Sequence, residues 1–173
     1  MSETPINWPR TGDRAFHASP DRGRIEAFIM PSDGIYLVGF QRAGDMLVDA
    51  AKADDRNPDD LFFAIAFLYR HHLELMLKGL VRLGLRSGAI ESCDDILNGH
   101  NIHKLWNRVA RLICEAWPDA PDDDFRAAEQ LILEFHKLDP DGQSFRYATD
   151  KNGLRHLENA PKRVDLENLN TTV

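Results

Sequence analysis

The densest group of polar side chains in the sequence is one stretch near the middle, which reads Tyr-Arg-His-His-Leu-Glu. Arg70 and Glu74 are four residues apart, as are Glu74 and Lys78, so a helix would place all three on one face. An exposed face would make them a solvated ladder of ion pairs, whereas a covered face would make them the floor of a polar pocket. His71 joins this face, while His72 falls in register with apolar residues, which predicts a histidine packed in the core.

A second polar group surrounds the start of a later helix. His100 and His103 are three residues apart, and Asn101 between them is suited to cap the helix. A helix N-terminus supplies backbone donors and positive potential, which favour a phosphate group. Capping explains Asn101 but does not require two histidines.

The third group is Arg146, which follows an Asp-Gly turn and has an aromatic neighbour on each side, one of them Tyr147. A guanidinium at this place can form a salt bridge with a buried carboxylate such as Asp139 or Glu74. It can also bind an anionic ligand, because its geometry matches carboxylate and phosphate. The spacing alone favours the salt bridge slightly.

Apolar side chains at spacings of three and four predict the helices that must position these groups. We expect an all-α fold, an antiparallel four- to five-helix bundle formed by residues 34–173, in which neighbouring helices run in opposite directions. Loss of the helical period predicts a small β-hairpin over 145–157 after helix four, and an incomplete last helix over 164–173. Prolines and glycines in residues 1–33 predict an irregular N-terminal segment that covers the bundle. The four main helices are expected at about 34–54, 58–83, 101–117 and 122–139, with Tyr36, Phe40, Ala43, Leu47 and Ala50 as the buried stripe of the first.

Length and charge limit the classes of function. The chain has 173 residues, with 21 Lys+Arg against 28 Asp+Glu and a formal net charge of −7. This acidity opposes broad, charge-driven coating of nucleic acid, although it leaves room for one small basic pocket. We find no membrane-spanning stretch and no signal peptide, and two cysteines cannot form a disulfide framework. We therefore expect a cytoplasmic protein without a membrane partner.

Three motifs together resemble a bacterial branch of the HEPN superfamily. They are Phe67-Leu68-Tyr69-Arg70-His71-His72-Leu73-Glu74-Leu75-Met76-Leu77-Lys78, Gly99-His100-Asn101-Ile102-His103-Lys104-Leu105-Trp106 and Phe145-Arg146-Tyr147. The resemblance spans roughly Gly34 to Gly153. It implies a compact α-helical bundle, a homodimer, and a protein of the toxin–antitoxin or phage-defence type with an antitoxin-like partner.

The resemblance also implies a function, a metal-independent ribonuclease with an Arg and a His on one helix that are separated by four to six intervening residues. Only Arg10 and His17 have this spacing, and they lie outside the predicted bundle. Either the site is assembled across elements and binds RNA or a nucleotide, or the chain is a non-catalytic dimeric interaction module whose polar cluster is structural. The first reading assigns catalysis to Arg70, His71, Glu74 and His100, and substrate binding to His103, Arg146 and Tyr147.

Neither reading requires a cofactor or a metal ion. A metal site remains a third option, because His71 with Glu74 and His100 with His103 each place two ligand types on one helical face. The Glu-x-x-His pattern of carboxylate di-iron bundles does not occur in the sequence.

Overall fold

The computed structural model describes residues 29–53, 58–92, 94–119 and 122–173, together with five single positions between 11 and 27. The chain divides into two units, Met1–Met30 and Pro31–Val173. The predicted N-terminal cover lies mostly outside the described residues. The second unit is described below.

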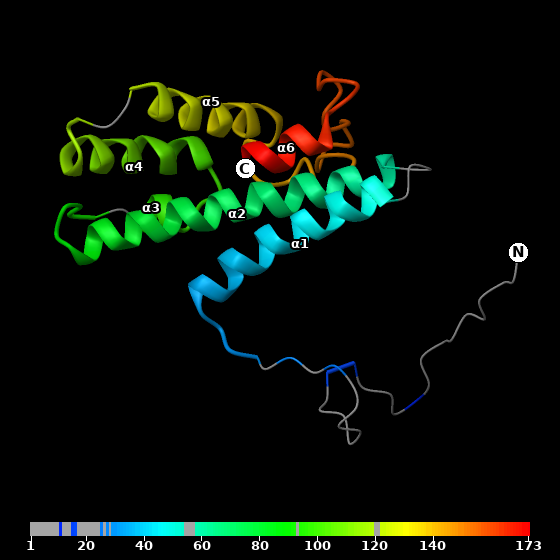
Figure 1. Cartoon of the computed structure of the whole chain (residues 1–173), viewed down its shortest axis with the longest axis horizontal. Helices are drawn as coiled ribbons and strands as arrows, with labels where there is room; N and C mark the ends of the chain where they lie inside the picture. Colours follow the sequence, from blue (N-terminus) through cyan, green and yellow to red (C-terminus); the bar gives the residue numbers. More distant parts are fainter. Residues whose placement is uncertain are drawn as a thin grey trace, which may run out of the picture. The chain divides into compact units, whose positions relative to one another are not determined.

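The described part of the second unit contains helices and no strands, as the all-α class predicts (Figure 1). The helices are α1 (Asp33–Ala53), α2 (Asp59–Arg86), α3 (Asp94–Leu97), α4 (Ile102–Ala116), α5 (Asp122–Leu138) and α6 (Leu166–Thr172). None of the described helices is both long and apolar enough to cross a membrane. The short helix α3 was not predicted from the sequence.

Helix α2 lies at the centre of the core, as its apolar sequence predicts. It packs against α1 and α4, and α4 packs in turn against α5 (Figure 1). Its buried apolar side chains, from Ile65 to Val81, join those of α4 and α5 in one cluster. His72 lies in this core and its Nδ1 is 3.0 Å from the carbonyl oxygen of Leu37, which confirms the prediction of a packed histidine.

The direction of α4 differs from the predicted antiparallel arrangement. Glu74 contacts His100 near the start of α4, and a Cβ on Gly84 would meet Leu112 further along it. Helices α2 and α4 therefore run parallel, because residues 94–101, including α3, lie back along α2 before α4 begins (Figure 1). The pairs α1–α2 and α4–α5 are antiparallel, as predicted.

The buried stripe of α1 is rotated by one residue from the predicted one. Gly44, Val48 and Ala51 are buried, whereas Tyr36 and Ala50 are exposed. The reason is a close approach at Gly44, where a Cβ would stand 2.6 Å from the ring of Tyr69. A glycine lets the two helices approach at this point, and hydrophobic periodicity does not detect it.

The predicted β-hairpin over 145–157 is wrong. This segment is a series of turns with one isolated antiparallel bridge between Thr149 and Arg155. The Asp150 side chain accepts hydrogen bonds from the backbone N–H groups of Asn152 and Leu154, which closes a tight turn and leaves too few residues for paired strands. Helix α6 forms where the last helix was expected, and Asp165 caps it by accepting from the N–H groups at 167 and 168.

Candidate functional site

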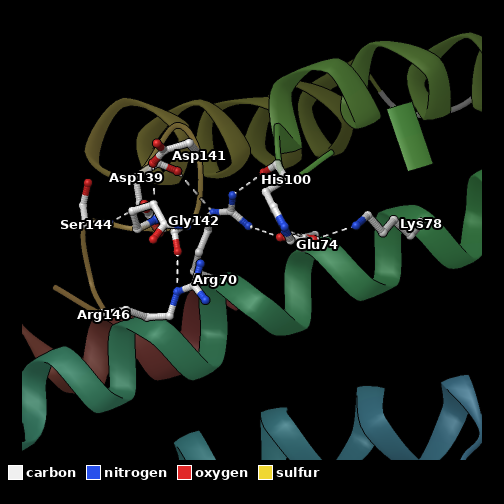
Figure 2. A network of polar contacts seen from close by, with 10 residues as sticks. Arg70, Glu74, Lys78, His100, Asp139, Asp141, Gly142, Ser144 and Arg146 are labelled. Atoms are coloured by element: carbon white, nitrogen blue, oxygen red, sulfur yellow. Dashed lines mark hydrogen bonds and ion pairs between the residues drawn. The ribbon is translucent and has the colours of Figure 1, made fainter. Parts of the chain in front are cut away.

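Arg70 is the centre of the polar network that the sequence indicated. Its Nη1 donates to Glu74 Oε2 at 3.0 Å, and its Nη2 donates to the carbonyl oxygen of His100. Its Nε donates to the carbonyl oxygen of Asp139 at 3.3 Å and lies 3.9 Å from the Asp139 carboxylate. One side chain thus joins α2, the start of α4 and the end of α5 (Figure 2).

The side chains of this network are buried, so the alternative of a solvated ladder of ion pairs is excluded for Arg70, Glu74 and Lys78. The exposed fractions are 1% for Arg70, 3% for Glu74 and 8% for Lys78. Lys78 Nζ donates to Glu74 Oε1 at 2.8 Å, which completes the ion pairs. Buried charges persist only when they are paired and hydrogen-bonded, and here both conditions hold.

Glu74 remains ionised in this surrounding. Burial alone raises the pKa of the Glu74 carboxyl, but the hydrogen bond and charge of Lys78 lower it, with further contributions from His100 and Arg70. The net effect is a pKa below the usual value. The carboxylate can therefore only accept hydrogen bonds at neutral pH.

This charge state fixes the tautomer of His100. Its Nδ1 lies 2.9 Å from Glu74 Oε1, so Nδ1 carries the ring proton and donates a hydrogen bond to the carboxylate. In the neutral ring, Nε2 is then an acceptor with a free lone pair. The His100 side chain is 53% exposed, which makes the imidazole accessible to a ligand.

A loop after α5 positions Arg146. Asp139 is fully buried, and its Oδ1 accepts from the backbone N–H of Ser144 at 2.8 Å. Gly142 has a φ of +77°, which favours glycine, and its carbonyl oxygen accepts from Arg146 Nε at 2.6 Å (Figure 2). A Cβ placed on Gly142 would lie within 4 Å of His100 Cβ and of Arg146 Nη2, so the loop brings these two residues together.

The favoured salt bridge of Arg146 is not formed. Arg70 takes both of the carboxylates that were considered, Asp139 and Glu74. Arg146 is exposed, and its guanidinium carbon lies 5.8 Å from the ring centres of both Phe67 and Tyr147. The two buried carboxylates are already paired with Arg70 and Lys78, which leaves Arg146 as a cation at the surface.

His71 lies beside the network. Its ring is edge-on to Phe40 at 4.5 Å and parallel to Phe67 at 5.7 Å between centres. Burial lowers the pKa of His71, and the opposing attraction of Glu74 does not restore it. The ring is therefore neutral at pH 7 and packs as an aromatic side chain.

His103 points to another neighbour. Its ring centre lies 5.3 Å from that of His136 on α5, and its Nε2 lies 3.3 Å from Asn107 Nδ2. The prediction of Asn101 as a cap is confirmed, because its side chain accepts from the N–H of Lys104. The sequence assigned no role at the site to Phe67, Gly142 or His136. The Asp-Pro-Asp-Gly turn indicates Gly142, whereas no local pattern indicates the other two.

The described residues contain no group of three or more His, Cys, Asp or Glu side chains arranged to hold a metal ion. The four-ligand set considered from the sequence therefore does not converge: His71 packs between aromatic rings and His103 lies beside His136. Comparisons of the chain with protein-family models, with curated proteins and with solved structures find no match. The relation to the HEPN superfamily stays a prediction.

Proposed function

We propose that this chain is a HEPN-like helical module that binds RNA or a nucleotide and cleaves RNA by a metal-independent reaction. The observation that carries the proposal is the pair of His100 and Glu74, in which a buried carboxylate holds an exposed imidazole with Nε2 free to accept a proton. A histidine oriented by a second group through its other nitrogen is a common general base.

The chemistry that fits this pair is transesterification by the RNA 2′-hydroxyl. Nε2 of His100 takes the hydroxyl proton, and the 2′-oxygen forms a bond to phosphorus. The bond from phosphorus to the 5′-oxygen breaks, and that oxygen receives a proton from water. The products are a 2′,3′-cyclic phosphate and a 5′-hydroxyl, and Arg146 stabilises the charge on the phosphate oxygens.

The sealed residues take supporting roles in this proposal. Arg70 and Lys78 keep Glu74 ionised, and Arg70 also fixes the backbone on both sides of the site through the carbonyl groups of His100 and Asp139. The network thus orients His100 without touching the substrate. Tyr147 and Phe67 supply aromatic surface around Arg146, and His71 stacks on Phe67.

The test is cleavage of a mixed-sequence RNA in the presence of EDTA, with the product ends identified. We expect 2′,3′-cyclic phosphate ends from the wild type and a loss of about 100-fold or more in the His100→Gln variant, because general bases contribute about 10²–10⁴-fold. Arg111→Gln on the exposed side of α4 is the matched control and should cleave at the wild-type rate. Equal rates for the wild type and a folded His100→Gln variant would remove the nuclease proposal.

A second candidate is a non-catalytic dimeric interaction module. The observation that favours it is exposed apolar surface at the start of α1, where Ile35, Tyr36 and Val38 are at least half exposed. Such surface supports a contact with a second copy or with an antitoxin-like partner. Val38→Glu should then shift the wild-type dimer to a monomer in sedimentation, with Lys151→Glu as the control, and RNA cleavage should be absent from both.

A further inference from the structure

A cavity of about 460 Å³ lies next to the proposed site, between the first turns of α2 and the turns that follow residue 143. Tyr147 belongs to both, because it lines the cavity and its ring lies under the guanidinium of Arg146. This volume falls in the range of small-ligand sites. The cavity shares Ser144 with the polar network, because the backbone N–H of Ser144 donates to Asp139.

The walls of the cavity include two large aromatic side chains that the fold leaves half exposed. The exposed fraction is 51% for Phe63 and 56% for Tyr147. Aromatic side chains of this kind provide stacking surface for a planar ring. A planar, unsaturated ligand gains more from them than an aliphatic ligand of the same size.

The cavity also has hydrogen-bonding groups that the fold does not fully use. His156 lines it, and its Nδ1 lies 3.3 Å from Ser144 Oγ, while its buried Nε2 has no hydrogen-bond partner among the described residues. Thr149 and Arg155 line it too, and the bridge between them holds this wall in place. These side chains offer both donors and acceptors.

We propose that this cavity binds the nucleobase of a nucleotide whose phosphate is held by Arg146. The inference rests on the proposed function and names the part of the substrate that is recognised. A base has a planar face for Phe63 and Tyr147 and polar edges for His156, Thr149 and Arg155. Its attached phosphate reaches Arg146, the residue next to Tyr147 in the chain.

The experiment compares AMP and UMP with ribose 5-phosphate, which carries the same phosphate without a base, by calorimetric titration of the full chain. We expect the better of the two nucleotides to bind about ten-fold tighter than ribose 5-phosphate, because stacking on aromatic side chains has about this magnitude. Phe63→Ala should remove that advantage and leave the affinity for ribose 5-phosphate unchanged. The exposed side chain of Phe63 makes this variant compatible with folding.

A second variant tests the polar edge. His156→Phe keeps an aromatic side chain but removes both ring nitrogens. We expect it to reduce the affinity for the preferred nucleotide at least three-fold and to change the ratio of the AMP and UMP affinities. The matched control is Leu83→Ala, an exposed apolar truncation elsewhere on α2. The control should leave both quantities at the wild-type values.

The outcomes separate the two proposals. Equal affinity for nucleotides and ribose 5-phosphate would overturn the cavity inference and leave the phosphate site at Arg146 in place. A nucleotide advantage that survives Phe63→Ala would also overturn it. Absence of binding by all three compounds would overturn both the inference and the phosphate site on which it rests.

Discussion

Two sets of polar side chains near α2 differ in their exposure to solvent. Arg70, Glu74 and Lys78 are buried, and each forms hydrogen bonds with the others or with the backbone. Of the neighbouring buried Asp139 carboxylate, Oδ1 accepts a hydrogen bond, whereas Oδ2 accepts none from the described residues and lies 3.9 Å from Arg70 Nε. His100 and Arg146 are exposed, and one hydrogen bond orients each side chain: His100 to Glu74 in the network, and Arg146 to Gly142 in the loop after α5.

The difference shows how one buried network on α2 can stabilise the fold and also orient exposed residues from other elements. Burying a charge costs free energy unless the charge is paired. Arg70, Glu74 and Lys78, the inner set, are paired, and their contacts hold α2, α4 and α5 together. His100 and Arg146, the outer set, each use one side-chain hydrogen bond for orientation. Their other hydrogen-bonding groups remain available to a ligand. The inner residues should therefore affect stability when changed, and the outer residues should affect binding.

The largest effect on stability is expected from Arg70→Met. The variant leaves the Glu74 carboxylate with one cation fewer and leaves the carbonyl groups of His100 and Asp139 without their donor. We expect a loss of about 3–5 kcal/mol in the free energy of unfolding, measured by urea denaturation. Arg146→Met, the matched outer change, should cost less than about 1 kcal/mol. Equal losses would show that the two sets do not differ.

The next effect is the pH dependence that Glu74 confers. Its pKa is lowered in the folded chain from the usual value of 4.5, so the unfolded chain binds the proton first as the pH falls. Stability from this group is complete above about pH 4.5 and is lost below it. Glu74→Gln should unfold more easily at pH 7, by about 1.5–3 kcal/mol, and should lose less stability on acidification.

The readout for Glu74 is a series of denaturation curves between pH 3 and pH 7. Glu115→Gln is the control, because this carboxylate is exposed at the end of α4. It should follow the wild-type curve throughout. An acid limb of the same steepness in wild type and Glu74→Gln would contradict the assignment.

A smaller effect is expected from Tyr69, a second sealed group on α2. Its hydroxyl donates to Asp45 Oδ1 at 2.9 Å and accepts from Asn170 Nδ2, which links α6 to α1 and α2. Tyr69→Phe should cost about 1 kcal/mol, and Tyr36→Phe, an exposed tyrosine, should cost nothing measurable.

An alkaline titration of tyrosinate absorbance gives a second readout for Tyr69. Burial, followed by the charge and hydrogen bond of Asp45, raises the pKa of Tyr69 to about 12, although the Asn170 hydrogen bond lowers it. The wild type should therefore show one tyrosine that ionises well above pH 10, and the variant should lack it. Loss of this late step in Tyr36→Phe instead would contradict the structure.

The smallest expected effect concerns anion binding at Arg146, in the outer set. Asp141 is exposed on the same loop as Arg146 and repels an anion there (Figure 2). Asp141→Asn should raise the affinity for AMP about two- to three-fold at low salt, with no change in stability. The gain should shrink as the ionic strength rises; a gain that is independent of salt would show that charge is not its cause.

Much of the secondary structure follows from the sequence. The starts of α4 and α5, the end of α4 before Trp117 and the cap at Asn101 depend on local signals, and the structure has them where they were predicted. The hairpin was wrong because the alternation of side chains over so few residues does not distinguish strands from Asp-stabilised turns. The rotated face of α1 was missed because a close approach at Gly44 carries no periodic signal.

The spacing of Arg70, Glu74 and Lys78 matches the period of the helix, so the sequence alone places them on one helical face. Tertiary contacts are needed to bury this face, to pair Arg70 rather than Arg146 with Asp139, and to let Glu74 orient His100. Those contacts join residues 26 to 69 positions apart. They exist because residues 94–101 and the loop after α5 fold back onto α2, and no local pattern encodes that return.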